Sequence, residues 1–317
     1  MKNPIKELFK KRDGVFAIQL FANDKLTLSE FDEKHLILRM PIKGLWKYKP
    51  ILFQADPFLF VKNDRLYLFY EEQKGFSPGR IMMINTSDLK SWSNPVVVLQ
   101  ENFHLSFPYV FEDEGKVYMI PESGEDQSIR LYEANRDFTS FSFVRVLLKQ
   151  EKRIGPNSNY VDNHVIKNKG VYYLFTSYRN NWKIRQELFT TNNLLKGEFV
   201  RHPCSPIFVG NKYGRNGGSL ICYNDKLLRV SQDCSVEYGV NVSLHEINSI
   251  NETHYNETLF VDDLFSDNIL FPNGGHQLNI TSFLGKYVYG TDYREVKWTW
   301  YHLFHSAMVL LGFIKRQ

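Results

Sequence analysis

The sequence predicts an all-β fold, a five-bladed β-propeller. One module recurs along the chain: a leading residue, a short apolar strand, a polar turn and a second strand rich in aromatic residues. The residue that marks the second strand recurs at intervals of 51, 55, 55 and 59 residues. A nearly fixed period with several strands in each repeat is typical of a propeller. The marker residues are Tyr67, Tyr118, Tyr173, Leu228 and Tyr287.

Each copy begins eleven residues before its marker. The first copy runs from Asp56 through the turn Lys62-Asn63-Asp64 to Tyr70, and apolar or aromatic residues fill both of its strands. Aromatic residues make up 15% of the chain, which also favours strands over helices. A pair of β-sandwiches is the alternative, but it does not require five evenly spaced copies. The later copies begin at Phe107, Asp162, Gly217 and His276.

We expect residues 51–297 to form the propeller. Residues 1–50 contain two short apolar runs and are expected to be an N-terminal extension that contributes strands to the closure of the ring. Residues 298–317 form an aromatic and apolar segment that ends on Lys315-Arg316 and is too short to span a bilayer. We expect this segment to pack on the core; the alternative is peripheral contact with the inner face of a membrane.

The composition excludes several classes of protein. With 43% apolar and 23% charged residues, the chain can form a packed core and is not expected to be disordered. The net charge of +4 suits an anionic ligand but is too small for a nucleic-acid-binding surface. The three cysteines show no CxxC spacing, and the start lacks the apolar region of a signal peptide. We therefore expect no disulfide, no structural zinc and a cytoplasmic location.

The leading residues of the five copies are candidates for a functional site. The innermost strand of each propeller blade lines a central channel, so these residues are expected to meet at one mouth. Carboxylates among aromatic walls suit sugar chemistry. Asp56 before Pro57 and Asp162 before Asn163 are also ordinary turn residues, but two acids at one register favour a shared role. The converging residues are Asp56, the Phe107-Pro108-Tyr109 corner, Asp162, Asn216, Gly217, Gly218 and His276.

Two of these leading segments resemble a known group of propellers. Ala55-Asp56-Pro57 and Val161-Asp162 are similar to the blade openings of the arabinanase, xylosidase, invertase and levansucrase propellers. The resemblance implies that Asp56 is a general base and that Asp162 orients the site and tunes its pKa. Those enzymes open blade four with a glutamate that acts as general acid, whereas this chain has Asn216-Gly217-Gly218 there. Ordinary glycoside hydrolysis, which needs that acid, is therefore disfavoured.

Longer strings resemble the amino-terminal domain of the plant glucosamine inositolphosphorylceramide transferases, over residues 46–281. This resemblance implies a sugar-handling propeller related to glycan assembly. In the plant protein a separate carboxyl-terminal domain is the recognised glycosyltransferase. The plant domain continues its blade-three aspartate with Pro-Phe, where this chain has Asn163-His164. The matching strings are His104 to Glu112, Tyr118 to Glu122, Arg130 to Tyr132, Arg215 to Gly218 and Arg229 to Cys234.

Together these features predict a glycosyltransferase that uses a nucleotide sugar in surface-polysaccharide or glycolipid synthesis, with a glycan or glycolipid as acceptor. The diphosphate of such a donor leaves as a stable anion, so a single base suffices. In this interpretation Asp56 takes the proton of the acceptor hydroxyl, and Asp162 or Glu122 orients Asp56.

The phosphates of the donor would need cationic and N–H partners. Arg215, Arg229 and the backbone N–H groups of Gly217 and Gly218 are the candidates, since a guanidinium offers a bidentate fork. A structural ion pair is an equal alternative for Arg215, and a pair within the core is favoured for Arg229. The remaining substrate-binding candidates are His104, Tyr109, Asp233 and His276.

No cofactor or metal site is predicted. A divalent cation at the acidic turns Glu112-Asp113-Glu114 or Asp262-Asp263 is a weaker alternative, because acidic turns are common. Two other functions stay open. One is a hydrolase or phosphorylase of the propeller class, with Glu122 or Asp233 as its acid. The other is a non-catalytic, carbohydrate-recognising partner of a transferase.

Overall fold

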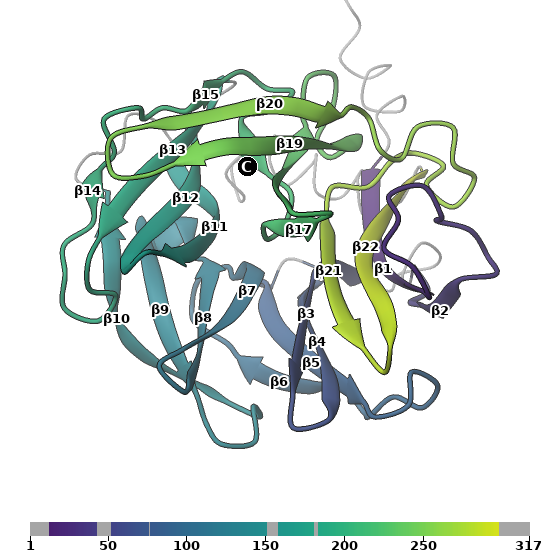
Figure 1. The fold of residues 1–317 in the computed structure, drawn as a ribbon. Helices are drawn as coiled ribbons and strands as arrows, with labels where there is room; N and C mark the ends of the chain where they lie inside the picture. Colours follow the sequence, from purple (N-terminus) through teal and green to yellow (C-terminus); the bar gives the residue numbers. More distant parts are fainter. Residues whose placement is uncertain (1–12, 43–51, 76, 151–157, 181–182, 298–317) are drawn as a thin grey trace, which may run out of the picture.

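Five antiparallel sheets surround a central axis in the computed structural model (Figure 1). The structure describes residues 13–42, 52–75, 77–150, 158–180 and 183–297. Within these ranges the only helical element is the short 3-10 turn η1 (Gly124–Asp126), and none of their helices is long and apolar enough to cross a membrane. The expectation of a five-bladed β-propeller is confirmed.

Blades one to three follow the chain from the channel outwards. Blade one consists of β3 (Leu52–Lys62), β4 (Arg65–Lys74), β5 (Arg80–Thr86) and β6 (Val96–Leu99). Blade two consists of β7 (Ser106–Asp113), β8 (Lys116–Glu122), β9 (Ser128–Ala134) and β10 (Phe141–Lys149). Blade three consists of β11 (Ser158–Asn168), β12 (Val171–Asn180), β13 (Lys183–Thr191) and β14 (Val200–Arg201), with β15 (Phe208–Val209) also paired to β13.

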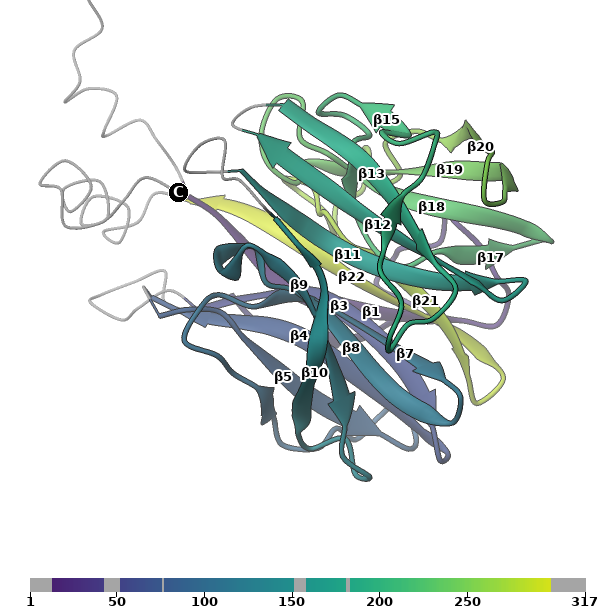
Figure 2. The same cartoon turned by 90° about the vertical axis from the view of Figure 1, so that its left-hand side faces the viewer.

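Blades four and five depart from this simple order. In blade four, the short strands β16 (Arg215–Asn216) and β17 (Ile221–Tyr223) both pair with β18 (Lys226–Asp233), which is followed by β19 (Asn241–Ile250) and β20 (Tyr255–Val261). Blade five combines β21 (Leu278–Phe283) and β22 (Lys286–Lys297) with β1 (Asp13–Asn23) and β2 (Leu36–Arg39). β1 pairs antiparallel with β22 along its whole length, so strands from both ends of the described chain close the ring (Figures 1 and 2).

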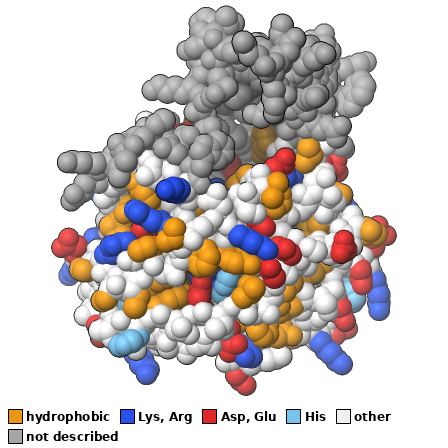
Figure 3. Space-filling view, turned by 90° about the horizontal axis from the view of Figure 1, so that it is seen from above, with side chains coloured by type: hydrophobic (Ala, Val, Ile, Leu, Met, Phe, Trp, Pro, Cys, Tyr) orange, Lys and Arg blue, Asp and Glu red, His pale blue; other side chains and the backbone are white. Residues whose placement is uncertain are grey.

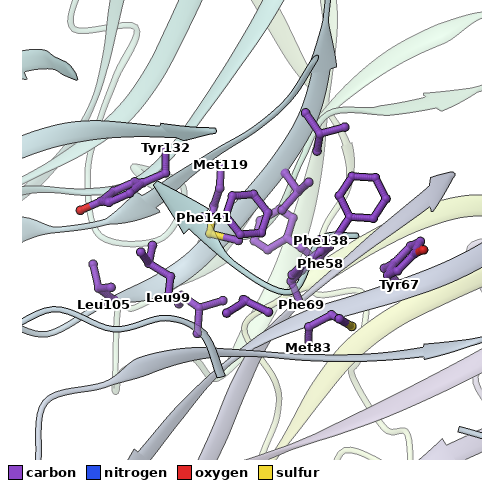
Figure 4. Close-up of a cluster of buried hydrophobic side chains, with 14 of the residues drawn as sticks. Phe58, Tyr67, Phe69, Met83, Leu99, Leu105, Met119, Tyr132, Phe138 and Phe141 are labelled. Atoms are coloured by element: carbon purple, nitrogen blue, oxygen red, sulfur yellow. The ribbon is translucent and has the colours of Figure 1, made fainter. Parts of the chain in front are cut away.

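Large aromatic side chains fill the wedges between neighbouring blades. Between blades one and two, the Phe58 and Phe107 rings lie 4.8 Å apart in an edge-to-face arrangement, with Phe69, Met119 and Phe141 buried beside them (Figure 4). Aromatic rings bury large apolar areas and favour this edge-to-face contact. The aromatic strand of each repeat is therefore the part that joins one blade to the next.

The innermost strands of blades one to three share a β-bulge at the leading residue. The pairing register shifts just after Ala55, Ser106 and Val161. The residues that follow have positive φ, with values of 54° at Asp56, 45° at Phe107 and 52° at Asp162. Left-handed backbone is unusual for such residues, and bulges of this kind re-aim side chains next to functional sites.

Blade four has a break at the same place. Gly218 has φ of 153°, and a Cβ there would lie 1.9 Å from the carbonyl oxygen of Leu278 in blade five. A side chain at this position would collide with backbone, so glycine is required. The close approach of blades four and five therefore leaves no room for an acidic side chain at Gly218.

Candidate functional site

Two rings of residues meet at the channel. The inner ring contains the bulge residues Asp56, Phe107 and Asp162 of the innermost strands. The second strand of each of these blades contributes the residue fifteen positions after the bulge residue. These residues are Glu71, Glu122 and Ser177, and each pairs across the ladder with the residue just before the bulge. Asp292 on β22 is the neighbour of His276 in blade five, since its Oδ1 accepts the His276 backbone N–H at 2.8 Å. Acidic side chains from blades one, two, three and five therefore gather at one end of the channel strands.

Asp56 is held by blades two and five. Its Oδ2 accepts the backbone N–H of Phe107 at 3.0 Å, and its Oδ1 lies 3.2 Å from Nε2 of His276. The other ring nitrogen of His276, Nδ1, lies 2.7 Å from Oδ2 of Asp292. Asp56 is 4% exposed, and His276 and Asp292 are also buried. The imidazole therefore bridges two carboxylates.

The charges of this triad follow from that arrangement. Burial alone would lower the pKa of His276, but Asp292 and Asp56 raise it to about 10. Burial alone would raise the pKa of Asp56, but the hydrogen bond and charge of His276, with the Phe107 N–H, hold it below its ordinary value. At neutral pH His276 is an imidazolium and Asp56 a carboxylate.

The same triad is the one group in the described ranges whose side chains could hold a metal ion. Ligand atoms of Asp56, His276 and Asp292 all lie within 4.8 Å of one another. A metal ligand must be a deprotonated imidazole nitrogen, whereas both nitrogens of His276 lie beside carboxylates that raise its pKa. The imidazolium supplies the positive charge that a cation would supply. The arrangement fits an ionic triad better than a metal centre.

The acidic turns considered for a cation are paired with lysines instead. Glu112 Oε2 lies 2.6 Å from Nζ of Lys62, and Asp113 Oδ1 lies 3.1 Å from Nζ of Lys167. Asp262 Oδ2 lies 2.8 Å from Nζ of Lys212. On the face drawn in Figure 3, Lys and Arg side chains are likewise mixed with Asp and Glu.

Arg215 lies in the site but is occupied by Asp162. Its Nε donates to Asp162 Oδ2 and its Nη2 to Oδ1 at 3.2 Å, while Glu122 Oε2 lies 3.7 Å from Nη2. Burial raises the pKa of Asp162 to about 7, with the charge of Arg215 acting in the opposite direction. Asn216 Nδ2 donates to the Asp162 carbonyl oxygen at 2.7 Å, so blades three and four are joined here.

The glycine segment of blade four is also engaged within the protein. The backbone N–H of Gly217 donates to the carbonyl oxygen of Val230 at 3.0 Å, and the Gly217 carbonyl accepts from Leu278 at 2.8 Å. Gly217 is thus bonded within blade four and to blade five, while Arg215 is bonded to Asp162 of blade three.

Glu71 and His104 form a second pair, on blade one and the loop before β7. Glu71 Oε1 lies 3.3 Å from Nε2 of His104, and Nδ1 of His104 accepts the backbone N–H of Gly79 at 3.0 Å. Burial raises the pKa of Glu71 well above its ordinary value, and the charges of Asp56 and Glu122 add to the effect. Burial lowers the pKa of His104. Glu71, with a raised pKa, therefore lies near Asp56, whose pKa is lowered.

Sequence reasoning did not single out Glu71 or Tyr238. The sequence does contain a signal for Glu71, because the second strand of the first repeat ends on two carboxylates. Glu71 pairs with Ala55, the residue just before the bulge. Tyr238 lies in a loop, 43% exposed, with its ring 4.7 Å from the Arg215 guanidinium and 5.1 Å from the His276 ring. An exposed ring between the two ion pairs is a surface on which a sugar face can stack.

Three expected site residues are bonded to groups outside this cluster. Arg229 is fully buried and bonds Glu257 through Nε at 2.7 Å and Nη2 at 2.6 Å. Tyr109 donates its hydroxyl to the Val165 carbonyl at 2.6 Å, which ties blade two to blade three. Asp233 Oδ1 accepts the Ser235 N–H at 2.7 Å in a turn. For all three residues, the contacts are those of structural groups.

The raised pKa of His276 predicts a pH-dependent stability. Its folded-state value of about 10 exceeds the ordinary 6.5, so the imidazolium contributes stability that is fully present below pH 6.5 and is lost as pH rises through about 10. We expect the free energy of unfolding to decline over this window. Urea unfolding at several pH values measures it, with His276→Gln as the control. An equal difference between the two proteins at every pH would contradict the prediction.

Comparisons with known proteins agree with this architecture. A crystal structure of a GH43 protein from Bacillus licheniformis superposes with a TM-score of 0.51 at 18% identity, covering 67% of this chain and 43% of that chain. A family 117 glycoside hydrolase of Zobellia galactanivorans gives a TM-score of 0.53 at 13% identity, covering 82% and 90%. At these identities the likeness shows a shared fold.

Sequence relatives are more specific. Glucosamine inositolphosphorylceramide transferase 1 of Arabidopsis thaliana is 32% identical over 216 residues, which cover 66% of this chain and 27% of that protein. The protein of the same name from Oryza sativa subsp. japonica is also 32% identical, with 66% and 28% covered. The chain thus matches little more than a quarter of these relatives. The family model described as "Glucosamine inositolphosphorylceramide transferase 1, N-terminal" matches residues 47–267, and the chain belongs to this family.

Proposed function

We propose that this propeller transfers a glycosyl group and that Asp56 is the base that takes the proton of the attacking hydroxyl. The observation that supports this role is the state of Asp56. Its carboxylate is kept ionised by His276 and is fixed by the Phe107 N–H at the mouth of the channel. A positioned carboxylate of this kind can accept a proton from a hydroxyl within hydrogen-bond reach.

We propose a nucleotide sugar as the donor and a hydroxyl of a glycan or glycolipid as the acceptor. The support is chemical: blade four offers Asn216 and two glycines, and a diphosphate leaves as an anion without receiving a proton. The name of the relatives, glucosamine inositolphosphorylceramide transferase, is consistent with glycosyl transfer. Arg215 has no phosphate-binding role in this proposal, because Asp162 occupies its guanidinium.

A panel of nucleotide sugars tests the proposal. The protein is incubated with each donor, with and without oligosaccharide or glycolipid acceptors, and nucleoside diphosphate release is measured together with the melting temperature. We expect one donor to raise the melting temperature and to be consumed faster with an acceptor. Stabilisation by glycans with no release from any donor would overturn the proposal in favour of a carbohydrate-recognising partner protein.

A further inference from the structure

We propose that Glu71, held by His104, is a proton donor of this channel site, and that the site therefore also cleaves glycosides whose leaving group is an alcohol. This inference rests on the proposed role of Asp56 as the base. It assigns to blade one the acid that blade four lacks. The substrates would be unactivated glycosides, in addition to donors that leave as anions.

The register places Glu71 beside Asp56. Glu71 on β4 pairs across the ladder with Ala55 on β3, the residue that precedes Asp56 at the bulge. The Glu71 side chain is 11% exposed and that of His104 23% exposed, whereas the Asp292 side chain behind His276 is fully buried. Glu71 therefore keeps slightly more exposure than Asp292.

His104 determines which oxygen of Glu71 holds the proton. Its Nδ1 accepts the Gly79 N–H, so the neutral ring has its own proton on Nε2 and directs it at Glu71 Oε1, 3.3 Å away. Within the described part of the chain, Oε2 of Glu71 has no comparable partner. Oε1 is then the acceptor and Oε2 is the oxygen that bears the transferable proton.

The two matching carboxyls of blades one and two have different partners. Glu122, at the same strand position as Glu71, has Nη2 of Arg215 at 3.7 Å from its Oε2. Glu71 faces a neutral imidazole instead, and burial raises its pKa well above the ordinary value. A carboxyl with a raised pKa, Glu71, beside one with a lowered pKa, Asp56, is the usual arrangement for an acid and a base.

The reaction balances with these two groups. The bond between the sugar C1 and the leaving oxygen breaks while Glu71 delivers its proton to that oxygen, which gives an alcohol. The oxygen of water or of an acceptor hydroxyl forms the new bond to C1, and its proton passes to Asp56. One proton moved from Asp56 to Glu71 through solvent restores both groups, and no redox step occurs.

The test compares two classes of donor in the Glu71→Gln variant. Methyl glycosides of common hexoses and pentoses need protonation of the leaving group, whereas the matching glycosyl fluorides and nucleotide sugars do not. We expect wild-type protein to cleave a methyl glycoside, and the variant to do so about 10²-fold or more slowly, while activated donors change by only about threefold. Glu72→Gln, which alters the neighbouring carboxylate paired with Arg80, should leave both classes unchanged.

Several outcomes would overturn the inference. These are no cleavage of any methyl glycoside by wild-type protein, equal losses for both donor classes in Glu71→Gln, and no loss for either class. A second measurement guards against a folding defect: methyl glycoside turnover should fall at alkaline pH in the wild type, and the activity left in Glu71→Gln should lack this decline. If instead the proposed role of Asp56 as the base is wrong, Asp56→Asn would leave the turnover of activated donors unchanged. That result separates a failure of the Asp56 proposal from a failure of the Glu71 proposal.

Discussion

Replacing Asp56 with asparagine is expected to lower turnover of every accepted donor by about 10²-fold to 10⁴-fold, the usual contribution of a positioned acid or base. Asparagine keeps the size of the side chain and its acceptor oxygen for the Phe107 N–H, but it cannot take up a proton. His276 retains Asp292 as a partner at 2.7 Å, so we expect the fold to persist. Initial rates with saturating donor and the melting temperature measure the two effects separately.

The matched control for this variant is Asp64→Asn. Asp64 is an exposed residue of the turn in the same hairpin, and asparagine tolerates its positive φ of 55°. This control should keep full turnover. If Asp56→Asn retained more than about a tenth of wild-type turnover, Asp56 would not be the base. Loss of donor binding with unchanged chemistry would indicate a purely recognising role.

Replacing Arg229 with methionine is expected to lower the free energy of unfolding by about 3–5 kcal/mol, because the variant leaves an uncompensated buried charge. Glu257 would keep the Tyr255 hydroxyl at 2.6 Å but lose both guanidinium bonds. Urea unfolding followed by tryptophan fluorescence measures this loss. We expect the loss of stability to arise within blade four, because Arg229 lies on β18 and Glu257 on β20.

The double variant Arg229→Met with Glu257→Leu should be compared with the single variant Arg229→Met. It removes both charges, so we expect it to recover most of the lost stability. Glycosyl transfer by the double variant should remain near the wild-type rate, because neither residue lies at the channel cluster. A single variant that lost donor binding but not stability would restore the phosphate-binding role considered for Arg229.

The repeat explains which parts of this structure were predictable. Each blade needs aromatic strands to fill the wedge against its neighbour, so the spacing of residues such as Tyr67 and Tyr118 discloses the fold. The convergence of Asp56, Asp162 and His276 follows from the same spacing. Pairing between blades does not repeat, however. The Asp162–Arg215 contact joins residues 53 positions apart and depends on the break in blade four.

Charge states were the least predictable feature. In sequence, Glu71 and Glu122 are equivalent acids at the ends of equivalent strands. Their partners differ: a neutral imidazole faces Glu71 and a guanidinium faces Glu122, and both partners come from elsewhere in the chain. A single chain without its fold does not disclose which carboxyl holds a proton.

The closure of blade five by β1 and β22 has a practical consequence for anyone who divides this protein. The region matched by the family model, 47–267, contains none of the four strands of that blade. A fragment cut at those boundaries would expose two unpaired faces and would lack both His276 and Asp292. Asp56 would then lose the charge that keeps it ionised. Such a fragment would contain every residue of the family match and still lack one blade of the ring and two residues of the channel cluster.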